Sequence, residues 1–144
     1  MFTCSKLYPE IPFAHRQHRH NGHCALIHGH NWSFRLTFAA EELDACGFVV
    51  DFGSLGYVKE WLFKTFDHAC CFNRDDLEGL RLVESHPHFF HAVVIENCSA
   101  EGIAQYVCES VGRLVTTETG GRVRVAQVEV FEDTRNAACF KPAD

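Results

Sequence analysis

Regular alternation of apolar and polar side chains predicts where strands lie in this chain. Every second side chain after His30 is apolar, at Trp32, Phe34, Leu36 and Phe38. This is the period of a half-buried β-strand, which we expect over residues 30–40. A second alternation over 48–52 predicts the hairpin partner of that strand, with residues 41–47 as the turn.

Three further strands are expected near the two ends of the chain. Residues 2–8 predict a first strand, which the two prolines that follow interrupt. A last hairpin begins at Arg122, and its first strand alternates through Val128 and Val130. Residues 136–141 are the closing strand of that hairpin.

Apolar residues spaced three or four apart predict two amphipathic helices. The first covers residues 54–66, with a core stripe at Leu55, Val58, Leu62 and Phe66. Ser99 fits the N-cap of the second helix. The buried stripe of that helix is expected at Ile103, Tyr106, Val107, Val111 and Leu114. Between the two helices, residues 74–98 lack periodicity and predict surface loops with three solvated histidines, His86, His88 and His91.

The composition is that of one domain spanning residues 1–144, with 47% apolar residues available for a core. A net charge of −6 predicts neither a nucleic-acid nor an anionic-membrane partner. No signal peptide or membrane-spanning apolar run is recognisable, so we expect a cytoplasmic protein with reduced cysteines. The cysteines expected mostly as small core residues are Cys4, Cys46, Cys70, Cys71, Cys98, Cys108 and Cys139.

The densest group of metal-binding side chains lies between His15 and Trp32, where six of the ten histidines surround Cys24. His28 and His30 are two residues apart at the start of a predicted strand, so both point to one face. Two imidazoles there can chelate a divalent ion, and His15 can supply a third nitrogen. Three neutral histidines with an open fourth position are typical of catalytic zinc, whereas structural zinc takes four protein ligands. The chain has no Cys-x-x-Cys pair, which argues against a zinc ribbon or finger.

Other polar residues have both a structural and a chemical interpretation. The histidine-rich stretch can be a solvated loop, because short metal motifs often occur by chance. Asp67 precedes His68, and a neighbouring carboxylate orients an imidazole and raises its basicity for proton transfer. Asp51 is interpreted as a turn or helix-start carboxylate. Glu132 falls on the apolar face of the last hairpin, where a carboxylate is costly unless donors bind it.

These residues together resemble the family of 6-pyruvoyl-tetrahydropterin and 6-carboxy-tetrahydropterin synthases. The family pattern is an early Ala-His and then Cys-x-x-x-His-Gly-His opening a strand, which Ala14-His15 and the stretch from Cys24 to His30 match. Further matches in chain order are Asp67-His68, Phe72-Asn73, Ser99-Ala100-Glu101 at the second helix start, and Glu132. The departures are the prolines before His15, Phe66 in place of a leucine, and a longer connection over residues 74–98.

The resemblance implies an α+β tunnelling fold (T-fold), with a four-stranded antiparallel sheet and two helices on one face in the order ββααββ. Chains of this family join edge to edge into an oligomeric barrel, which covers the sheet edges that an open sheet leaves exposed. The resemblance therefore implies a homo-oligomer, either a hexamer built as a dimer of trimers or a tetramer, with active sites between subunits.

The resemblance also implies the roles of individual residues. Zinc binds to His15, His28 and His30, and the substrate is a pterin triphosphate. Glu132 holds the N–H edge of the pterin, and Ser99 and Glu101 line its pocket, although Glu101 in a first turn equally suits the helix dipole. Cys24 as a thiolate and His68 oriented by Asp67 move protons. Arg16 and His20 are candidates for binding the triphosphate.

The favoured function is a zinc-dependent lyase, 6-carboxy-5,6,7,8-tetrahydropterin synthase. It converts 7,8-dihydroneopterin triphosphate to 6-carboxy-tetrahydropterin, acetaldehyde and triphosphate in queuosine biosynthesis. The alternative is 6-pyruvoyl-tetrahydropterin synthase, which eliminates triphosphate without carbon–carbon cleavage. A non-catalytic zinc-binding protein with Cys24 as fourth ligand is the alternative from a different class. A zinc hydrolase is disfavoured because the chain has no His-Glu-x-x-His.

Overall fold

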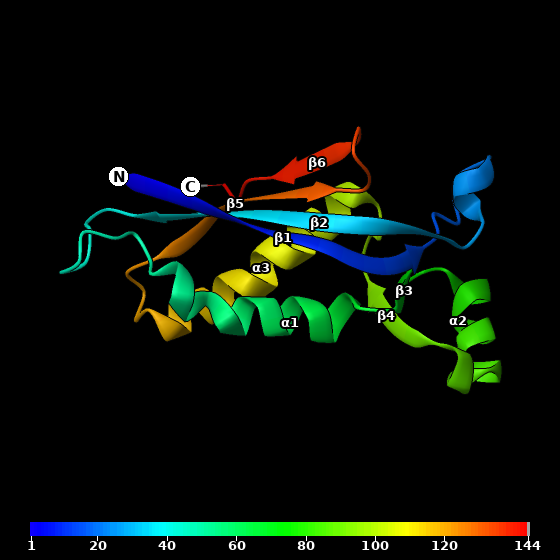
Figure 1. The fold of residues 1–144 in the computed structure, drawn as a ribbon. Coiled ribbons are helices and arrows are strands. Elements are labelled where there is room, and N and C mark those ends of the chain that lie inside the picture. Colours follow the sequence, from blue (N-terminus) through cyan, green and yellow to red (C-terminus); the bar gives the residue numbers. More distant parts are fainter. Residues whose placement is uncertain (144) are drawn as a thin grey trace.

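Six strands form one mixed sheet that runs across the molecule (Figure 1). The structure is a computed structural model, and it describes residues 1–143. The order of strands across the sheet is β4-β3-β1-β2-β5-β6. Their bounds are β1 Phe2–His15, β2 His28–Ala40, β3 Ala69–Asn73, β4 His91–Ile95, β5 Arg124–Phe131 and β6 Ala137–Phe140.

The four antiparallel strands expected from the family resemblance are β1, β2, β5 and β6. Two short strands that the sequence analysis missed, β3 and β4, extend the sheet beyond β1 and run parallel to it. The sheet therefore has an antiparallel part that carries the long strands and a parallel part contributed by the middle of the chain. The α+β T-fold is confirmed, with these two strands added.

The first strand is longer than predicted, because the prolines do not end it. β1 pairs with β2 from Phe2 to His15, and the register shifts between Tyr8 and Ile11. At this bulge Glu10 has a φ of 61°. A proline lacks the N–H that a central strand needs, but a bulge or an edge tolerates it. Because β1 meets β3 only at its last two residues, most of its length has a single strand neighbour.

The strand predicted over residues 48–52 is absent from the described structure. One side of β2 pairs with β1 and the other with β5, so no side was left for a hairpin partner. Instead Val49 and Val50 are buried, whereas Phe48 and Phe52 lie exposed. Asp51 caps the short 3-10 turn Phe52–Leu55 by accepting the Gly53 N–H at 2.8 Å, which confirms its interpretation as a turn carboxylate.

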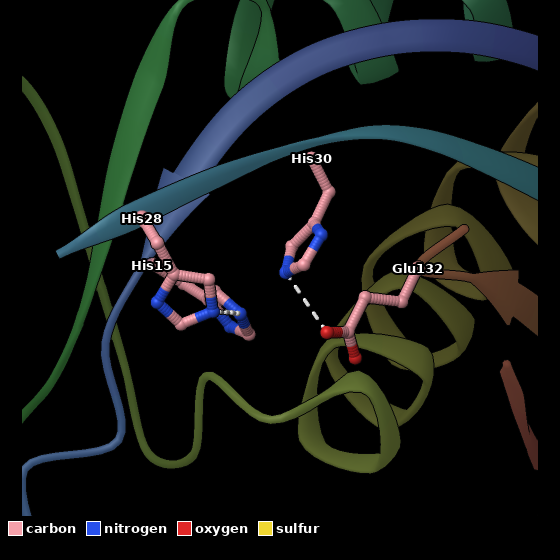
Figure 2. A group of neighbouring side chains, drawn as sticks. All are labelled: His15, His28, His30 and Glu132. Atoms are coloured by element: carbon pink, nitrogen blue, oxygen red, sulfur yellow. Dashed lines mark hydrogen bonds and ion pairs between the residues drawn. The ribbon is translucent and has the colours of Figure 1, made fainter. Parts of the chain in front are cut away.

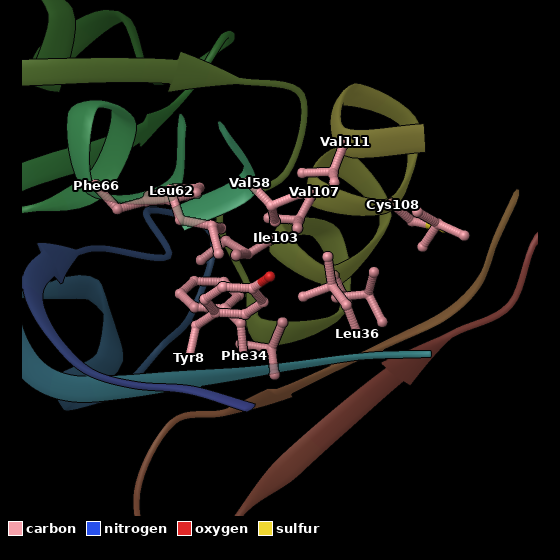
Figure 3. Packing of buried hydrophobic residues seen from close by; sticks show 14 of the residues in the cluster. Tyr8, Phe34, Leu36, Val58, Leu62, Phe66, Ile103, Val107, Cys108 and Val111 are labelled. Carbon is pink, nitrogen blue, oxygen red and sulfur yellow. The ribbon is translucent and has the colours of Figure 1, made fainter. Parts of the chain in front are cut away.

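Two helices, α1 (Gly56–Phe66) and α3 (Ala100–Glu118), cover one face of the sheet as predicted (Figure 1). Figure 3 shows their buried side chains meeting those of the sheet, with Phe34 and Leu36 of β2 facing Leu62 and Ile103. All four residues of the stripe predicted for the first helix are fully buried. Ser99 is the N-cap of α3 and accepts the Gly102 N–H at 3.2 Å. Because this face is packed against the helices, the even-numbered side chains of β2 point toward them.

A third helix, α2 (Leu77–Ser85), lies in the stretch predicted to be loops. Asp76 caps it by accepting the Gly79 N–H at 3.0 Å. His86, His88 and His91 are exposed, as expected. Among residues 1–143, no helix has both the length and the apolar character that crossing a membrane requires.

All eight cysteines are free thiols. Cys70, Cys71, Cys98 and Cys108 are buried, as expected of small core residues. Burial raises the pKa of the Cys98 thiol to about 11, which keeps it protonated and unreactive near neutral pH. Cys46 and Cys139 are exposed, so these two are not core residues.

Candidate metal centre and active site

Three histidines and one glutamate converge at one end of the helix-covered face of the sheet (Figure 2). His15 ends β1 and His28 begins β2, and the register of the two strands places them directly opposite each other. His30 follows on the same face of β2, because alternate residues of a strand share a face. Glu132 comes directly after β5. One ligand atom from each residue lies within 4.8 Å of the others.

Backbone carbonyls fix the orientation of two of the imidazoles. His15 Nδ1 is 2.7 Å from the carbonyl oxygen of Cys98, and His28 Nδ1 is 2.7 Å from that of Leu26. A carbonyl can only accept a hydrogen bond, so each Nδ1 carries the proton and donates it. In neutral imidazoles this leaves each Nε2 with a free lone pair. Outer contacts of this kind typically orient histidines that bind a metal.

The two free nitrogens point at each other. His15 Nε2 and His28 Nε2 are 3.1 Å apart. Two lone pairs at that distance repel unless a cation lies between them. Nitrogen ligands about 2.0–2.1 Å from a tetrahedral zinc ion lie roughly 3.3 Å from each other. The spacing therefore fits two ligands of one metal ion. Burial lowers the pKa of His15, which favours the neutral form that binds metals.

The third imidazole has a buried nitrogen without a hydrogen bond. His30 Nε2 is buried and lacks a correctly directed partner, although Glu132 Oε1 is only 2.8 Å away. Buried polar atoms in folded proteins are nearly always paired, so an unpaired one calls for an explanation. A nitrogen and a carboxylate oxygen that meet without hydrogen-bond geometry are arranged like two ligands of one ion. Three imidazoles and a carboxylate are a donor set that suits a divalent metal such as zinc.

Cys24 lies outside this group of four. It sits in the short 3-10 turn His23–Ala25, where its side chain is partly exposed. The loop that carries it is closed by a hydrogen bond from the Gln17 N–H to the Cys24 carbonyl oxygen at 2.8 Å. The fourth side chain of the group is thus Glu132, and the arrangement does not correspond to a closed zinc site with Cys24 as a ligand.

Asp67 and His68 form the carboxylate–imidazole pair that the sequence suggested. His68 Nδ1 is 2.7 Å from Asp67 Oδ1, which leaves Nε2 available for proton transfer. The His68 side chain is 82% exposed. It lies outside the four side chains that could hold a metal ion, which we call the metal-binding group: His15, His28, His30 and Glu132. The backbone of His68 has a φ of 56°, an unusual conformation for a residue with a side chain, and its N–H donates to the Pro12 carbonyl oxygen.

The start of α3 lies against the metal-binding group. The carbonyl oxygen that holds His15 belongs to Cys98, the residue before the N-cap Ser99. The Ser99 hydroxyl is occupied by capping, and Glu101 is exposed in the first turn of the helix. The sequence contains no signal for the Cys98 contact, because it uses a backbone carbonyl that every residue possesses.

A cavity of about 420 Å³ opens beside His30 and Glu132. It lies where β2 and β5 separate, beyond their last pair, Ser33 and Phe131. Its charged side chains are mostly acidic, and its one cation, Arg35, is paired with Glu129 at 2.8 Å. The complete lining is Leu7, Glu10, His30, Asn31, Ser33, Arg35, Phe131, Glu132, Asp133 and Thr134. Apart from His30, the β2 residues of this lining are odd-numbered, Asn31, Ser33 and Arg35. Sequence analysis missed them, because polar residues at alternate positions of a strand are expected to be merely solvated.

Arg16 is not free to bind phosphate in this chain. Its guanidinium donates two hydrogen bonds to the buried carboxylate of Asp76, at 2.7 and 3.1 Å. A paired arginine of this kind is a poor anion site, since its donors are already used. His20 is exposed, and its Nδ1 accepts the Gly22 N–H at 2.9 Å.

Comparisons with known proteins identify the family of the chain. The model of the family described as 6-pyruvoyl tetrahydropterin synthase matches residues 6–143. A 6-carboxy-5,6,7,8-tetrahydropterin synthase of Rickettsia bellii is 32% identical over 108 residues, which cover 74% of this chain and 78% of that protein.

Solved structures show the same fold. An uncharacterized protein from Wolinella succinogenes has a TM-score of 0.84 at 18% identity, covering 99% of this chain and 98% of its own. The 6-pyruvoyl tetrahydropterin synthase of Caenorhabditis elegans has a TM-score of 0.68 at 19% identity, covering 99% and 96%. With a family model that spans nearly its whole length, the chain belongs to the 6-pyruvoyl tetrahydropterin synthase family.

Proposed function

We propose that the protein is a zinc-dependent 6-carboxy-5,6,7,8-tetrahydropterin synthase. It converts 7,8-dihydroneopterin triphosphate and one water to 6-carboxy-tetrahydropterin, acetaldehyde and triphosphate, in queuosine biosynthesis. The observation that carries this proposal is the convergence of His15, His28 and His30 beside Glu132. The names of the similar curated proteins support the carboxy product over the pyruvoyl product.

The three histidines are the proposed metal ligands. Their free nitrogens face inward, and the Cys98 and Leu26 carbonyls hold two of the rings in place. A zinc ion held there would act as a Lewis acid, which makes the substrate's side-chain hydroxyls and adjacent carbon protons more acidic. The histidines leave a fourth position for a substrate oxygen, provided that Glu132 binds the pterin.

Glu132 and the cavity beside it are proposed to bind the pterin ring. A carboxylate can accept two N–H bonds from the guanidine-like edge of the ring, which selects for that edge. The acidic lining of the cavity suits a ring that presents N–H donors. The same lining repels a triphosphate, so we place the phosphates outside the cavity, toward solvent.

Cys24 and His68 are proposed to move the protons. Cys24 acts as the thiolate that takes a proton from the substrate side chain, and His68, oriented by Asp67, is the second acid or base. Because His68 is exposed and lies outside the metal-binding group of its own chain, we propose that it serves the site of a neighbouring subunit. This requires a homo-oligomer with active sites between chains.

Product analysis tests the proposal. The zinc-loaded protein is incubated with 7,8-dihydroneopterin triphosphate, and the pterin, triphosphate and acetaldehyde are quantified. We expect acetaldehyde and 6-carboxy-tetrahydropterin in equal amounts. Formation of 6-pyruvoyl-tetrahydropterin without acetaldehyde would instead identify a pyruvoyl synthase. An unchanged substrate in the presence of full zinc would favour a non-catalytic zinc-binding protein.

A further inference from the structure

The buried side chain of Asn73, at the end of β3, hydrogen-bonds both to the segment that holds His15 and to the loop that carries Cys24. Its side chain is 1% exposed and makes three hydrogen bonds to other segments. One connects it to the segment that holds His15, and two connect it to the loop that carries Cys24.

The first connection runs to the metal-binding group. The Cys98 N–H donates to Asn73 Oδ1 at 2.7 Å. The carbonyl of the same residue accepts the His15 Nδ1–H at 2.7 Å. Asn73 therefore holds the backbone of the residue that orients the first metal-binding histidine.

The second connection runs to the Cys24 loop. Asn73 Nδ2 donates to Gln17 Oε1 at 2.8 Å and lies 3.1 Å from His18 Nδ1. The backbone N–H of Gln17 donates to the Cys24 carbonyl oxygen at 2.8 Å. The side chain of Gln17 is thus fixed by Asn73 at one end, while its backbone closes the turn that presents the thiol.

Backbone donors determine which way these amides face. The Cys98 N–H can only donate, so the Asn73 atom beside it is the oxygen and the atom beside Gln17 is the nitrogen. The Ser99 N–H likewise fixes the oxygen of Asn97, which accepts Gln17 Nε2 at 2.7 Å. Gln17 must therefore present its oxygen to Asn73. The network has one consistent orientation, because reversing any amide in it would place two donors or two acceptors against each other.

We propose that Asn73 is a positioning residue that sets the distance between the Cys24 thiol and the metal-binding histidines. This role depends on Cys24 being the proton-transfer thiol, as proposed above. Asn73 belongs neither to the metal-binding group nor to the lining of the cavity beside it, and it acts through Gln17 and Cys98. The substitution Asn73→Asp separates the two connections, because the new carboxylate keeps an acceptor for the Cys98 N–H and loses the donors for Gln17 and His18.

The test compares Asn73→Asp with Gln17→Leu, which removes the acceptor of the Asn73 amide together with the Gln17–Asn97 hydrogen bond. Both variants, as zinc-loaded full-length protein, are expected to keep one zinc per chain. Amide hydrogen exchange over residues 16–27 is expected to accelerate about tenfold, with α3 and β5 unchanged. The kcat for dihydroneopterin triphosphate should fall about tenfold or more, with KM changed less than about twofold, because the thiol acts on the bound substrate. Gln105→Leu, which removes an exposed amide on α3, is the matched control and should leave all values unchanged.

The double variant sharpens the result. If both residues act through one bridge, the double variant should be no slower than the slower single variant. Wild-type exchange in the 16–27 loop and wild-type kcat in Gln17→Leu would overturn the proposal, even if Asn73→Asp failed to fold. Accelerated exchange throughout the protein would also overturn it, because that indicates general destabilisation. Loop exchange is read without turnover, so the positioning role is separable from failure of the proposed reaction.

Discussion

The metal-binding group and the Asp67–His68 pair both lie at the ends of strands. All four side chains of the group meet within one chain, whereas, among residues 1–143, the His68 side chain has only its neighbour Asp67 as a partner. His15, His28 and His30 come from adjacent paired strands, and carbonyls of the same chain orient two of the rings. His68 has an orienting carboxylate but is 82% exposed. The difference teaches that the sheet brings together, within one chain, four side chains that could hold a metal ion, whereas the Asp67–His68 pair faces outward, where we propose that a second chain completes it.

The largest expected effect is loss of the metal. His28→Ala removes one of two nitrogens that meet at 3.1 Å, so zinc should be released. Turnover should fall about 10³-fold or more, because Lewis-acid stabilisation is worth several kcal/mol. Zinc is measured by atomic emission on purified protein, with the exposed His86→Ala as a matched control. Full zinc occupancy after replacing all three histidines by alanine would refute the assignment.

Cys24→Ala separates the enzyme from a zinc-binding module. We expect zinc content and melting temperature to stay at wild-type values while turnover falls about 10³- to 10⁴-fold, within the range of acid–base catalysis. Cys46→Ala, at an exposed cysteine, is the control. If Cys24 were a zinc ligand, the variant would lose zinc and stability together, because structural zinc contributes folding energy. Turnover near the wild-type rate with zinc intact would remove the thiol from the mechanism.

Subunit mixing tests the outward-facing pair. His68→Gln should keep zinc and lose about 10²- to 10³-fold in turnover, as expected for removal of a proton-transfer group. Mixed oligomers of His68→Gln and His28→Ala should regain part of the wild-type activity, because some sites then receive an intact metal-binding group and an intact His68 from different chains. If mixing restores nothing while mixed oligomers form, both groups act within one chain.

Glu132→Gln gives the smallest expected effect and tests which role the carboxylate plays. Loss of a charge-assisted hydrogen bond costs about 1.5–3 kcal/mol, so pterin affinity should fall roughly ten- to hundredfold. Zinc should be retained, because three histidines remain. Binding is measured by fluorescence titration with a pterin, and Glu109→Gln, exposed on α3, is the control. Loss of zinc instead would make Glu132 a permanent metal ligand.

Sequence periodicity predicted those parts of the site that depend on strand geometry. The shared face of His28 and His30 follows from the period of two along β2, and the inward side of Glu132 follows from the same rule in β5. The pairing of Asp67 with His68 needed only neighbouring residues in the chain. These features are local, and local features can be read without knowing the tertiary fold.

The features that the sequence did not predict depend on contacts between distant segments. β3 and β4 pair through five-residue stretches too short for a clear pattern. The strand predicted over 48–52 does not form, because β5 pairs with the side of β2 where that strand would have paired. A local pattern does not show which of two segments will pair there. The Cys98 carbonyl and the amide of Asn73 bridge segments more than 20 residues apart. Such contacts become visible only once the sheet is assembled.

The central claim is that three histidines hold the zinc that turnover requires, and a metal titration tests it most directly. Protein stripped with a chelator is supplied with increasing zinc, and acetaldehyde release from dihydroneopterin triphosphate is followed. We expect activity to rise in proportion to zinc, level off at one zinc per chain, and remain absent in His28→Ala throughout. Stripped protein that releases acetaldehyde at the wild-type rate without zinc would contradict the account.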